Sequence, residues 1–295
     1  MLTCTLFLAL GLVPALVPVL PAVAPQPQLP TAVVDVAWLQ AHLHNAGLVL
    51  LHVGPPDGYA RAHISGARLV RMDAITTGTD TLALELPAVD DLVRAFQALG
   101  VTDDSHVVLY WDADWVPPTT RVWFTLDRLG LAERASILDG GLTAWQAAGG
   151  AVTAEAPSAV VPGRLTTHPR DVTVGLEWVA ARLQDSTVVI LDTREPRFWN
   201  GSDPGSQPRA GRIPGALNVP YSSLLRDGRL LDLADADGLL RAAGAGPGKR
   251  IVTYCHRGQQ ATVAYFTARR LGYDVRLFDG SFQQWSRHTE LPVAR

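Results

Sequence analysis

The sequence predicts an α/β fold of two similar domains, each a parallel sheet flanked by helices, related to one another by internal duplication. Three observations support this prediction. Strand-like and helical stretches alternate along the chain, as is typical of parallel sheets covered by helices. Several motifs of the first half recur in the same order in the second half. The length of 295 residues is sufficient for two domains, each with its own core.

The duplication rests on five matched segments. Trp38 is as far from Trp178 as Asp139 is from Asp279, so the spacing is kept over most of the chain. Chance would not preserve so many matches in one order. The pairs are Val34–Leu39 with Val174–Val179, Leu48–Val53 with Val188–Thr193, Ala62–Ala67 with Gly211–Ala216, Val107–Tyr110 with Ile251–Tyr254, and Asp139–Gly141 with Asp279–Ser281.

The first thirty residues differ from the rest of the chain. Residues 6–20 are almost wholly apolar, and Ala22-Val23-Ala24 resembles a signal-peptide cleavage site. No Lys or Arg precedes the apolar run, and Pro25 would directly follow the cut, so an unstructured leader is the alternative to a signal peptide. We therefore place residues 1–30 outside the fold. The protein is exported if residues 1–24 are a signal peptide, and cytoplasmic otherwise. A stable membrane span is not expected.

The remaining chain divides into a first domain over residues 31–150, a linker over 151–172 and a second domain over 173–295. The linker is rich in Pro and Gly and has no clear periodicity. Helices are expected over residues 120–129 and 261–271. Residues 201–208, an insertion relative to the first copy, are expected to form a surface loop. Two α/β domains joined in this way form a cleft, which is a preferred place for a small-molecule site.

Composition excludes several classes of function. The formal net charge is −3 and the basic residues are scattered, so no nucleic-acid partner is expected. Cys4 and Cys255 are the two cysteines, so a disulfide framework is excluded. His42 and His44 lack a nearby cysteine or carboxylate at ligand spacing, so no metal site is predicted.

Cys255 is the candidate nucleophile. It follows the strand-like segment Ile251–Tyr254 and precedes a glycine-containing loop and a helix that begins near Ala261. Loop N–H groups and the helix N-terminus can converge there on an anion. His256 and Arg257 would add positive charge, so we expect the thiol pKa to fall below its usual ~8.5. A packed core cysteine is the alternative.

The first copy has lost this arrangement. Trp111 aligns with Cys255, and Asp112 and Asp114 follow it in place of the His-Arg-Gly loop. Acids at this position would repel an anionic substrate and raise the pKa of any thiol. His52 likewise stands where the second copy has Asp192. We expect the first domain to line the cleft without taking part in the chemistry.

The chain resembles the tandem rhodanese family of sulfurtransferases. The resemblance rests on an active-site cysteine confined to the second of two copies, and it covers nearly the whole chain after residue 30. The motifs that carry it are Leu191-Asp192-Thr193-Arg194, Gly211–Ala216, the Cys255–Gln260 loop, and Asp279-Gly280 ahead of Trp285. It implies two rhodanese-like domains and transfer of a sulfane sulfur from thiosulfate to a thiophilic acceptor, cyanide or a thiol.

The reaction implied by the resemblance fits these residues. Attack of a Cys255 thiolate on the outer sulfur of thiosulfate would expel sulfite and leave a persulfide, which then passes its sulfur to the acceptor. No metal or organic cofactor is needed. The partners are a small-molecule sulfur donor and the acceptor, and the oligomeric state is left open. Backbone N–H groups of the loop residues Arg257, Gly258, Gln259, Gln260 and Ala261 would stabilise charge on the sulfur.

Three further residues are assigned supporting roles beside Arg257, which offers a permanent charge to the sulfonate oxygens. His256 is expected to assist it. By resemblance, Arg197 corresponds to a substrate-binding arginine, although its spacing from Asp192 is one residue shorter than in the vertebrate enzyme. Asp192 corresponds to an aspartate that orients the active-site loop or its arginines. A structural ion pair at the edge of the sheet is the alternative for Arg197 and Asp192.

Three alternative functions use a similar reactive cysteine. A 3-mercaptopyruvate sulfurtransferase would usually carry Gly and a small polar residue after the cysteine, whereas His256 and Arg257 form a bulkier, more positive rim. The related cysteine phosphatases place Arg six residues after Cys, where this chain has Ala261. A persulfide carrier that does not turn over needs the same reactive thiol and remains open.

Overall fold

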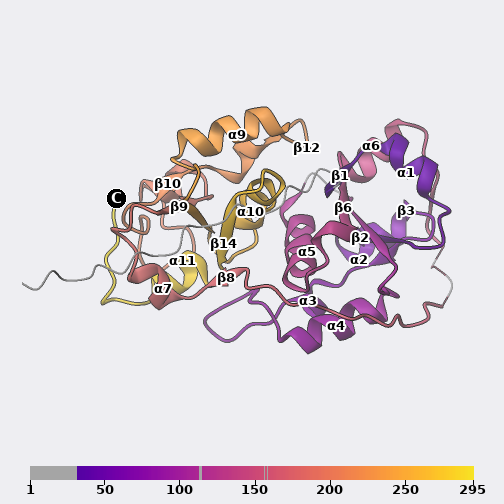
Figure 1. Cartoon of the computed structure of the whole chain (residues 1–295), viewed down its shortest axis with the longest axis horizontal. Coiled ribbons are helices and arrows are strands. Elements are labelled where there is room, and N and C mark those ends of the chain that lie inside the picture. The colour runs from indigo at the N-terminus through magenta and orange to yellow at the C-terminus, as the bar shows by residue number, and fades with distance from the viewer. Residues whose placement is uncertain (1–31, 113–114, 156, 158) are drawn as a thin grey trace, which may run out of the picture.

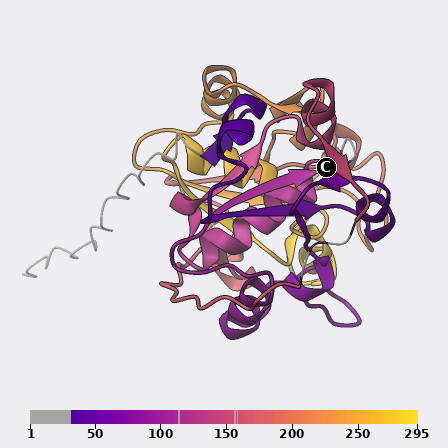
Figure 2. The same ribbon diagram turned by 90° about the vertical axis from the view of Figure 1, so that its right-hand side faces the viewer.

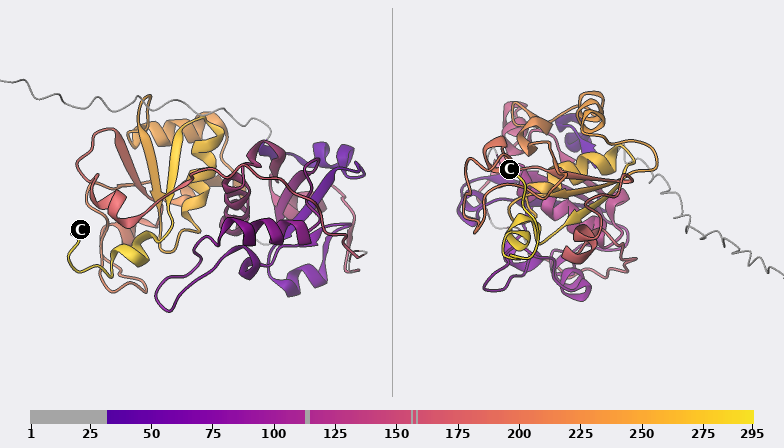
Figure 3. Two further views of the ribbon diagram at one scale, coloured as in Figure 1. Left: turned by 60° about the horizontal axis from the view of Figure 1, so that its bottom comes forward. Right: turned by 90° about the vertical axis from the view of Figure 1, so that its left-hand side faces the viewer.

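The computed structural model describes residues 32–112, 115–155, 157 and 159–295. The leader with its possible cleavage site, Cys4 and Asp114 lie outside these residues. The two halves of the chain form two domains that lie side by side, and the segment between them runs along both (Figures 1 and 3). Within the described ranges, no helix is both long and apolar enough to cross a membrane.

The first domain has a five-stranded parallel sheet with the order β1-β6-β5-β2-β4. Helices flank this sheet (Figure 2, in which the first domain faces the viewer). Its elements are β1 (Val33–Val34), α1 (Val36–His42), β2 (Leu48–Val53), α2 (Pro56–Arg61), β3 (His63–Ile64), β4 (Arg68–Leu69), α3 (Met72–Ile75), α4 (Val89–Ala98), β5 (His106–Trp111), α5 (Pro117–Arg128), the 3-10 helix η2 (Ala132–Arg134), β6 (Ala135–Leu138), α6 (Gly141–Ala147) and β7 (Val152–Thr153).

The second domain repeats this topology. Its sheet, β8-β14-β13-β9-β10, is again five-stranded and parallel. The predicted fold class is therefore confirmed. The elements are β8 (Thr173–Val174), α7 (Leu176–Ala180), β9 (Val188–Asp192), α8 (Pro196–Trp199), β10 (Leu217–Asn218), the 3-10 helix η3 (Tyr221–Leu224), β11 (Leu225–Arg226), β12 (Arg229–Leu230), α9 (Leu233–Ala242), β13 (Arg250–Tyr254), α10 (Ala261–Arg270), β14 (Asp274–Phe278) and α11 (Ser281–Trp285).

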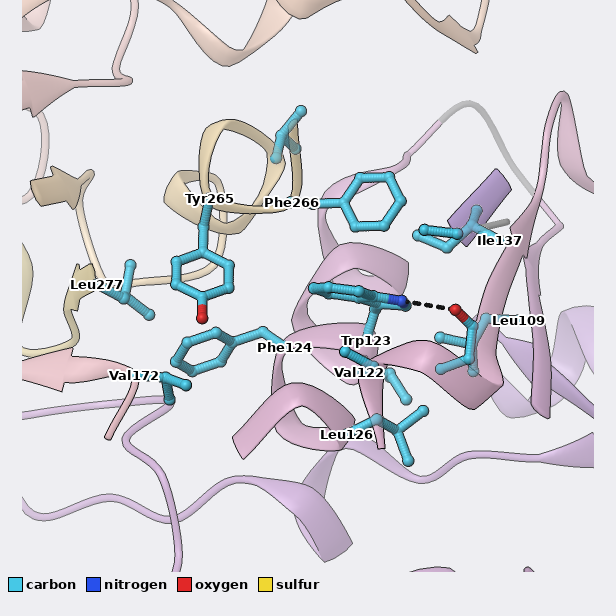
Figure 4. Packing of buried hydrophobic residues seen from close by; sticks show 14 of the residues in the cluster. Leu109, Val122, Trp123, Phe124, Leu126, Ile137, Val172, Tyr265, Phe266 and Leu277 are labelled. Atoms are coloured by element: carbon cyan, nitrogen blue, oxygen red, sulfur yellow. Dashed lines mark hydrogen bonds between the residues drawn. The ribbon is translucent and has the colours of Figure 1, made fainter. Parts of the chain in front are cut away.

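Helices α5 and α10 pack against each other where the domains meet (Figure 4). Trp123 meets Phe266 edge-to-face at 4.7 Å between ring centroids, and Phe124 meets Tyr265 in the same way at 4.8 Å. These four rings are buried and belong to one hydrophobic cluster that spans both domains. Burial of so much aromatic surface holds the domains together as one body.

Each domain also reaches across to the other. The segment 76–86 of the first domain places the N–H of Leu86 on the Asp279 carboxylate at 2.8 Å. The β11–β12 hairpin of the second domain makes the equivalent contact with the first domain, in which the N–H of Leu230 donates to the Asp139 carboxylate at 3.0 Å. Asp139 and Asp279, which occupy equivalent positions in the two repeats, therefore each accept a backbone N–H from the other domain. These reciprocal bonds place the first domain next to the residues that follow β14.

Some predicted boundaries shift. Helix α5 begins at Pro117, three residues before the predicted start, because proline is suited to the first turn of a helix. Helix α10 spans Ala261–Arg270, close to prediction. Within the predicted linker, β7 pairs in antiparallel fashion with β3 of the first domain. Trp145 and Trp285 are buried.

Candidate active site

Cys255 lies directly after β13, a strand in the middle of the second sheet between β9 and β14. The residues that follow β14 hold the cysteine backbone in place. The N–H of Phe282 donates to the Cys255 carbonyl at 3.0 Å, and the Cys255 N–H donates to Ser281 Oγ at 3.2 Å. The candidate nucleophile is therefore fixed at the carboxyl end of a parallel sheet, where α/β proteins build their sites.

The sulfur of Cys255 is buried and surrounded by main-chain donors. The residue is 1% exposed. Backbone N–H groups of Arg257, Gly258, Gln260 and Ala261 lie close enough to the sulfur to lower the pKa of the thiol. Such a ring of donors stabilises negative charge on a thiolate or a persulfide without a neighbouring base. The loop residues that the sequence analysis singles out thus lie around the sulfur.

The pKa of the thiol moves in the direction opposite to our expectation. Burial raises the pKa of Cys255, and the four N–H groups lower it without fully compensating. The donors of the loop are evident from the sequence, whereas the removal of the sulfur from water depends on the fold. Burial therefore opposes formation of the thiolate, and the backbone donors assist it.

Gly258 gives the loop its shape. Its φ is 81°, in the left-handed region that favours glycine. A Cβ at this position would stand 2.6 Å from Asp279 Oδ1, closer than real contacts allow. Asp279 in turn pairs with Arg121 of α5, in the other domain. The domain interface therefore packs directly on the active-site loop.

His256 adds no positive charge to the site. Burial and the charges of Arg194 and Arg257 lower the pKa of His256 to about 4, so the ring is neutral near pH 7. The expectation that His256 reinforces a positive field is wrong for this reason. The ring instead packs edge-on against Phe198 at 4.5 Å between centroids. Residues 201–208 form a loop here, and a Cβ on Gly205 would lie 3.5 Å from His256 Cε1.

The predicted substrate-binding arginines lie on the exposed rim. Arg257 is exposed beside the buried Cys255. The Arg197 side chain is 63% exposed, and its Nε lies 3.4 Å from Asp203 Oδ2. Its charge also lowers the pKa of His256, which places Arg197 close to the loop. Gln259 lies within the loop, where its carbonyl accepts from Thr262 Oγ1 at 2.7 Å.

Asp192 pairs with Arg194, a buried arginine that the sequence analysis does not assign to the site. Arg194 Nε donates to Asp192 Oδ1 at 2.9 Å, and Tyr254 Oη donates to Oδ2 at 2.6 Å. Burial opposes the charge of Arg194, but the bonds to Asp192 raise the pKa of Arg194 overall, and the Cys255 thiolate adds to this. A permanent cation therefore stands near the sulfur. The available signal was its position two residues after Asp192 in a motif already singled out.

The equivalent strand end of the first domain keeps the tyrosine but has no cysteine. Tyr110 Oη accepts from the N–H of Ile64 at 3.0 Å, as Tyr254 Oη accepts from the N–H of Ile213 at 3.2 Å. Trp111 occupies the place of the cysteine and is buried. The first domain therefore retains the tyrosine bond but offers no nucleophile there.

The family follows from comparison with known proteins. A model of the rhodanese-like domain matches residues 35–148 and again residues 175–288. The chain belongs to the rhodanese-like domain family. Thiosulfate sulfurtransferase of Azotobacter vinelandii is 31% identical over 264 residues, which cover 88% of this chain and 96% of that protein. The 3-mercaptopyruvate sulfurtransferase of Escherichia coli K12 is 29% identical over 271 residues, covering 87% and 95%.

A solved structure agrees with this assignment. The crystal structure of SseA from Escherichia coli, a 3-mercaptopyruvate sulfotransferase, superposes with a TM-score of 0.75 at 27% identity and covers 85% of this chain and 98% of that one. Both rhodanese-like domains are thus present in their usual tandem order. The protein is a sulfurtransferase of this family. Its relatives differ in the sulfur donor they are named for.

Proposed function

We propose that the protein transfers a sulfane sulfur from thiosulfate to a thiophilic acceptor, cyanide or a thiol, through a persulfide on Cys255. The observation that carries the proposal is the ring of four backbone N–H groups on the Cys255 sulfur. These donors favour an anionic sulfur in the free thiolate and in the persulfide alike. One arrangement thereby serves both halves of the reaction.

The first half-reaction breaks the S–S bond of thiosulfate. The Cys255 thiolate attacks the outer sulfur, sulfite leaves with the bonding electron pair, and Cys255 becomes a persulfide. In the second half-reaction the acceptor attacks the outer sulfur of the persulfide, and the Cys255 thiolate leaves. We assign Arg257 and Arg197 to the sulfonate oxygens because both are cationic and exposed beside the loop. Asp192 positions Arg194, which supports the charge on the sulfur.

The donor preference rests on charge. Thiosulfate is a dianion, whereas 3-mercaptopyruvate carries one carboxylate. Three arginines lie at or near the loop, namely Arg194, Arg197 and Arg257. The positive charge of each one lowers the pKa of His256. This cationic surrounding favours the dianion. The second candidate donor is 3-mercaptopyruvate, for which the Escherichia coli relative is named.

Steady-state kinetics with both donors and cyanide as acceptor test the proposal. We expect a larger kcat/KM for thiosulfate and many thiocyanate molecules formed per chain. A much larger kcat/KM for 3-mercaptopyruvate would refute the donor assignment. A single burst of one thiocyanate per chain would show a carrier instead of an enzyme. Cys255→Ala serves as the control that lacks the nucleophile.

A further inference from the structure

The first domain contains a cavity of about 390 Å³ at the place that the duplication pairs with the Cys255 site. It lies at the carboxyl ends of β2 and β5, beside β4 and the start of α3. Its walls are mostly apolar and come from Val53, Pro55, Leu69, Met72, Trp115 and Pro118. A cavity of this size and lining can hold a small organic molecule.

One acidic side chain in this cavity is almost completely buried. The Asp112 side chain is 9% exposed, and its carboxylate lies close to the backbone of Gly54 and Gly58. A Cβ on Gly58 would stand 2.0 Å from Asp112 Oδ2, and a Cβ on Gly54 would stand 2.4 Å from Oδ1. Both Gly54 and the carboxylate line the cavity. The acid is therefore built into the cavity floor.

The nearest basic side chain to Asp112 is His52, and it supplies no positive charge at pH 7. His52 Nε2 lies 3.4 Å from Asp112 Oδ2, beyond a good hydrogen bond, and this nitrogen has no hydrogen-bond partner in the described part of the chain. Burial lowers the pKa of His52 more than the nearby carboxylate raises it, so the ring is neutral at pH 7. A buried carboxylate beside a neutral ring favours a cationic ligand.

Within the described part of the chain, the other charged residues that line the cavity form one ion pair. Arg71 and Asp73 both line it, and they form an exposed two-bond ion pair with each other, with Nη2 to Oδ2 at 2.5 Å. Trp115 also lines the cavity and is 43% exposed, and an indole face can bind a cation. Among the described residues, the lining of the cavity thus combines apolar walls, one aromatic ring and one acid outside the Arg71–Asp73 pair. An anion such as thiosulfate would be repelled.

We propose that this cavity binds a small organic ammonium ion with an apolar or aromatic body. The ammonium group would lie against Asp112, and the body would fill the space between Val53, Leu69 and Met72. The proposal does not depend on the chemistry at Cys255, because no residue of the Cys255 loop lines the cavity. Sulfur transfer and cation binding are therefore tested separately.

Calorimetric titration of the full chain with phenethylamine tests the proposal. We expect one saturable site, with 2-phenylethanol, which has a similar shape but no charge, binding at least ten-fold more weakly. Asp112→Asn should weaken phenethylamine at least ten-fold and leave the thiosulfate–cyanide rate unchanged. Asp90→Asn makes the same charge change on an exposed acid outside the cavity and should leave binding unchanged.

Met72→Trp provides a second test that does not involve the buried acid. The larger ring should fill the cavity and abolish phenethylamine binding while sulfur transfer continues. No saturable binding at millimolar phenethylamine, equal binding of 2-phenylethanol, or full binding by either cavity variant would each overturn the proposal. An effect of Asp90→Asn equal to that of Asp112→Asn would show general charge attraction and would overturn it as well.

Discussion

At the scale of single residues, the Cys255 sulfur is subject to two opposed effects. Burial favours the neutral thiol, and four backbone N–H groups favour the thiolate. Burial has the larger effect, so the pKa of Cys255 is raised. The site is therefore arranged to stabilise an anionic sulfur that must first lose its proton. This ordering of effects gives a definite pH dependence for the reaction with the donor.

We predict that kcat/KM for thiosulfate rises with pH and continues to rise beyond ~8.5, the ordinary pKa of a thiol. Only the thiolate attacks the donor, and a raised pKa moves its formation to higher pH. Thiosulfate is fully ionised throughout this range and does not contribute. Measurement of kcat/KM between pH 5 and pH 10 checks this. A plateau reached below pH ~8.5 would contradict it.

The residues near Cys255 show what sequence reasoning could and could not predict. The loop and its main-chain donors were predictable because a strand, a glycine and a helix follow one another there. The neutrality of His256 was not, since it results from burial and from arginines that the fold brings together. Arg194 was missed for a similar reason. Its role depends on the direction of its side chain toward Asp192, which the sequence does not encode locally.

At the scale of elements, the active-site loop depends on a close approach between Gly258 and the residues after β14. A Cβ on Gly258 would stand 2.6 Å from Asp279 Oδ1 and 2.8 Å from the Asp279 carbonyl oxygen. Asp279 itself is fixed in place, because its carboxylate pairs with Arg121 and accepts a hydrogen bond from the N–H of Leu86. The loop cannot easily move away from such an arrangement.

We predict that Gly258→Ala lowers the rate of sulfur transfer at least ten-fold and destabilises the protein by about 2 kcal/mol or more. Gly248→Ala is the matched control, because Gly248 has φ 73° but nothing within 4 Å of an added Cβ. It should cost only about 1 kcal/mol and leave the rate unchanged. Urea unfolding and steady-state rates measure both. Equal effects of the two substitutions would show that the contact with Asp279 has no role.

At the scale of the whole molecule, the two domains are joined through buried rings, reciprocal loops and ion pairs. The duplicated architecture was predictable because it repeats in the sequence, and both sheets have the expected parallel order. The reciprocal contacts at Asp139 and Asp279 were not, since they require the placement of one domain against the other. Glu85 lies in this interface. Burial and the charge of Asp279 raise the pKa of Glu85 to about 7.

The raised pKa of Glu85 predicts a loss of stability as the pH rises through about 7. The folded state holds this proton more tightly than the unfolded state, so the contribution of Glu85 is fully present below pH 4.5, the unperturbed value, and is lost above pH 7. Glu85→Gln should therefore match the natural protein at pH 5 and exceed its Tm by roughly 2–4 °C at pH 8. Exposed Glu155→Gln is the control. A lower Tm for Glu85→Gln at pH 8 would refute this.

The central claim is that backbone N–H donors allow the buried Cys255 sulfur to hold a second sulfur atom as a persulfide. Mass spectrometry of the purified protein after exposure to thiosulfate tests it most directly. We predict the added mass of one sulfur atom on the peptide that contains Cys255, its removal by cyanide, and its absence from Cys255→Ala. An unmodified Cys255 peptide in protein that still forms thiocyanate, or a sulfur added at another residue, would contradict the account.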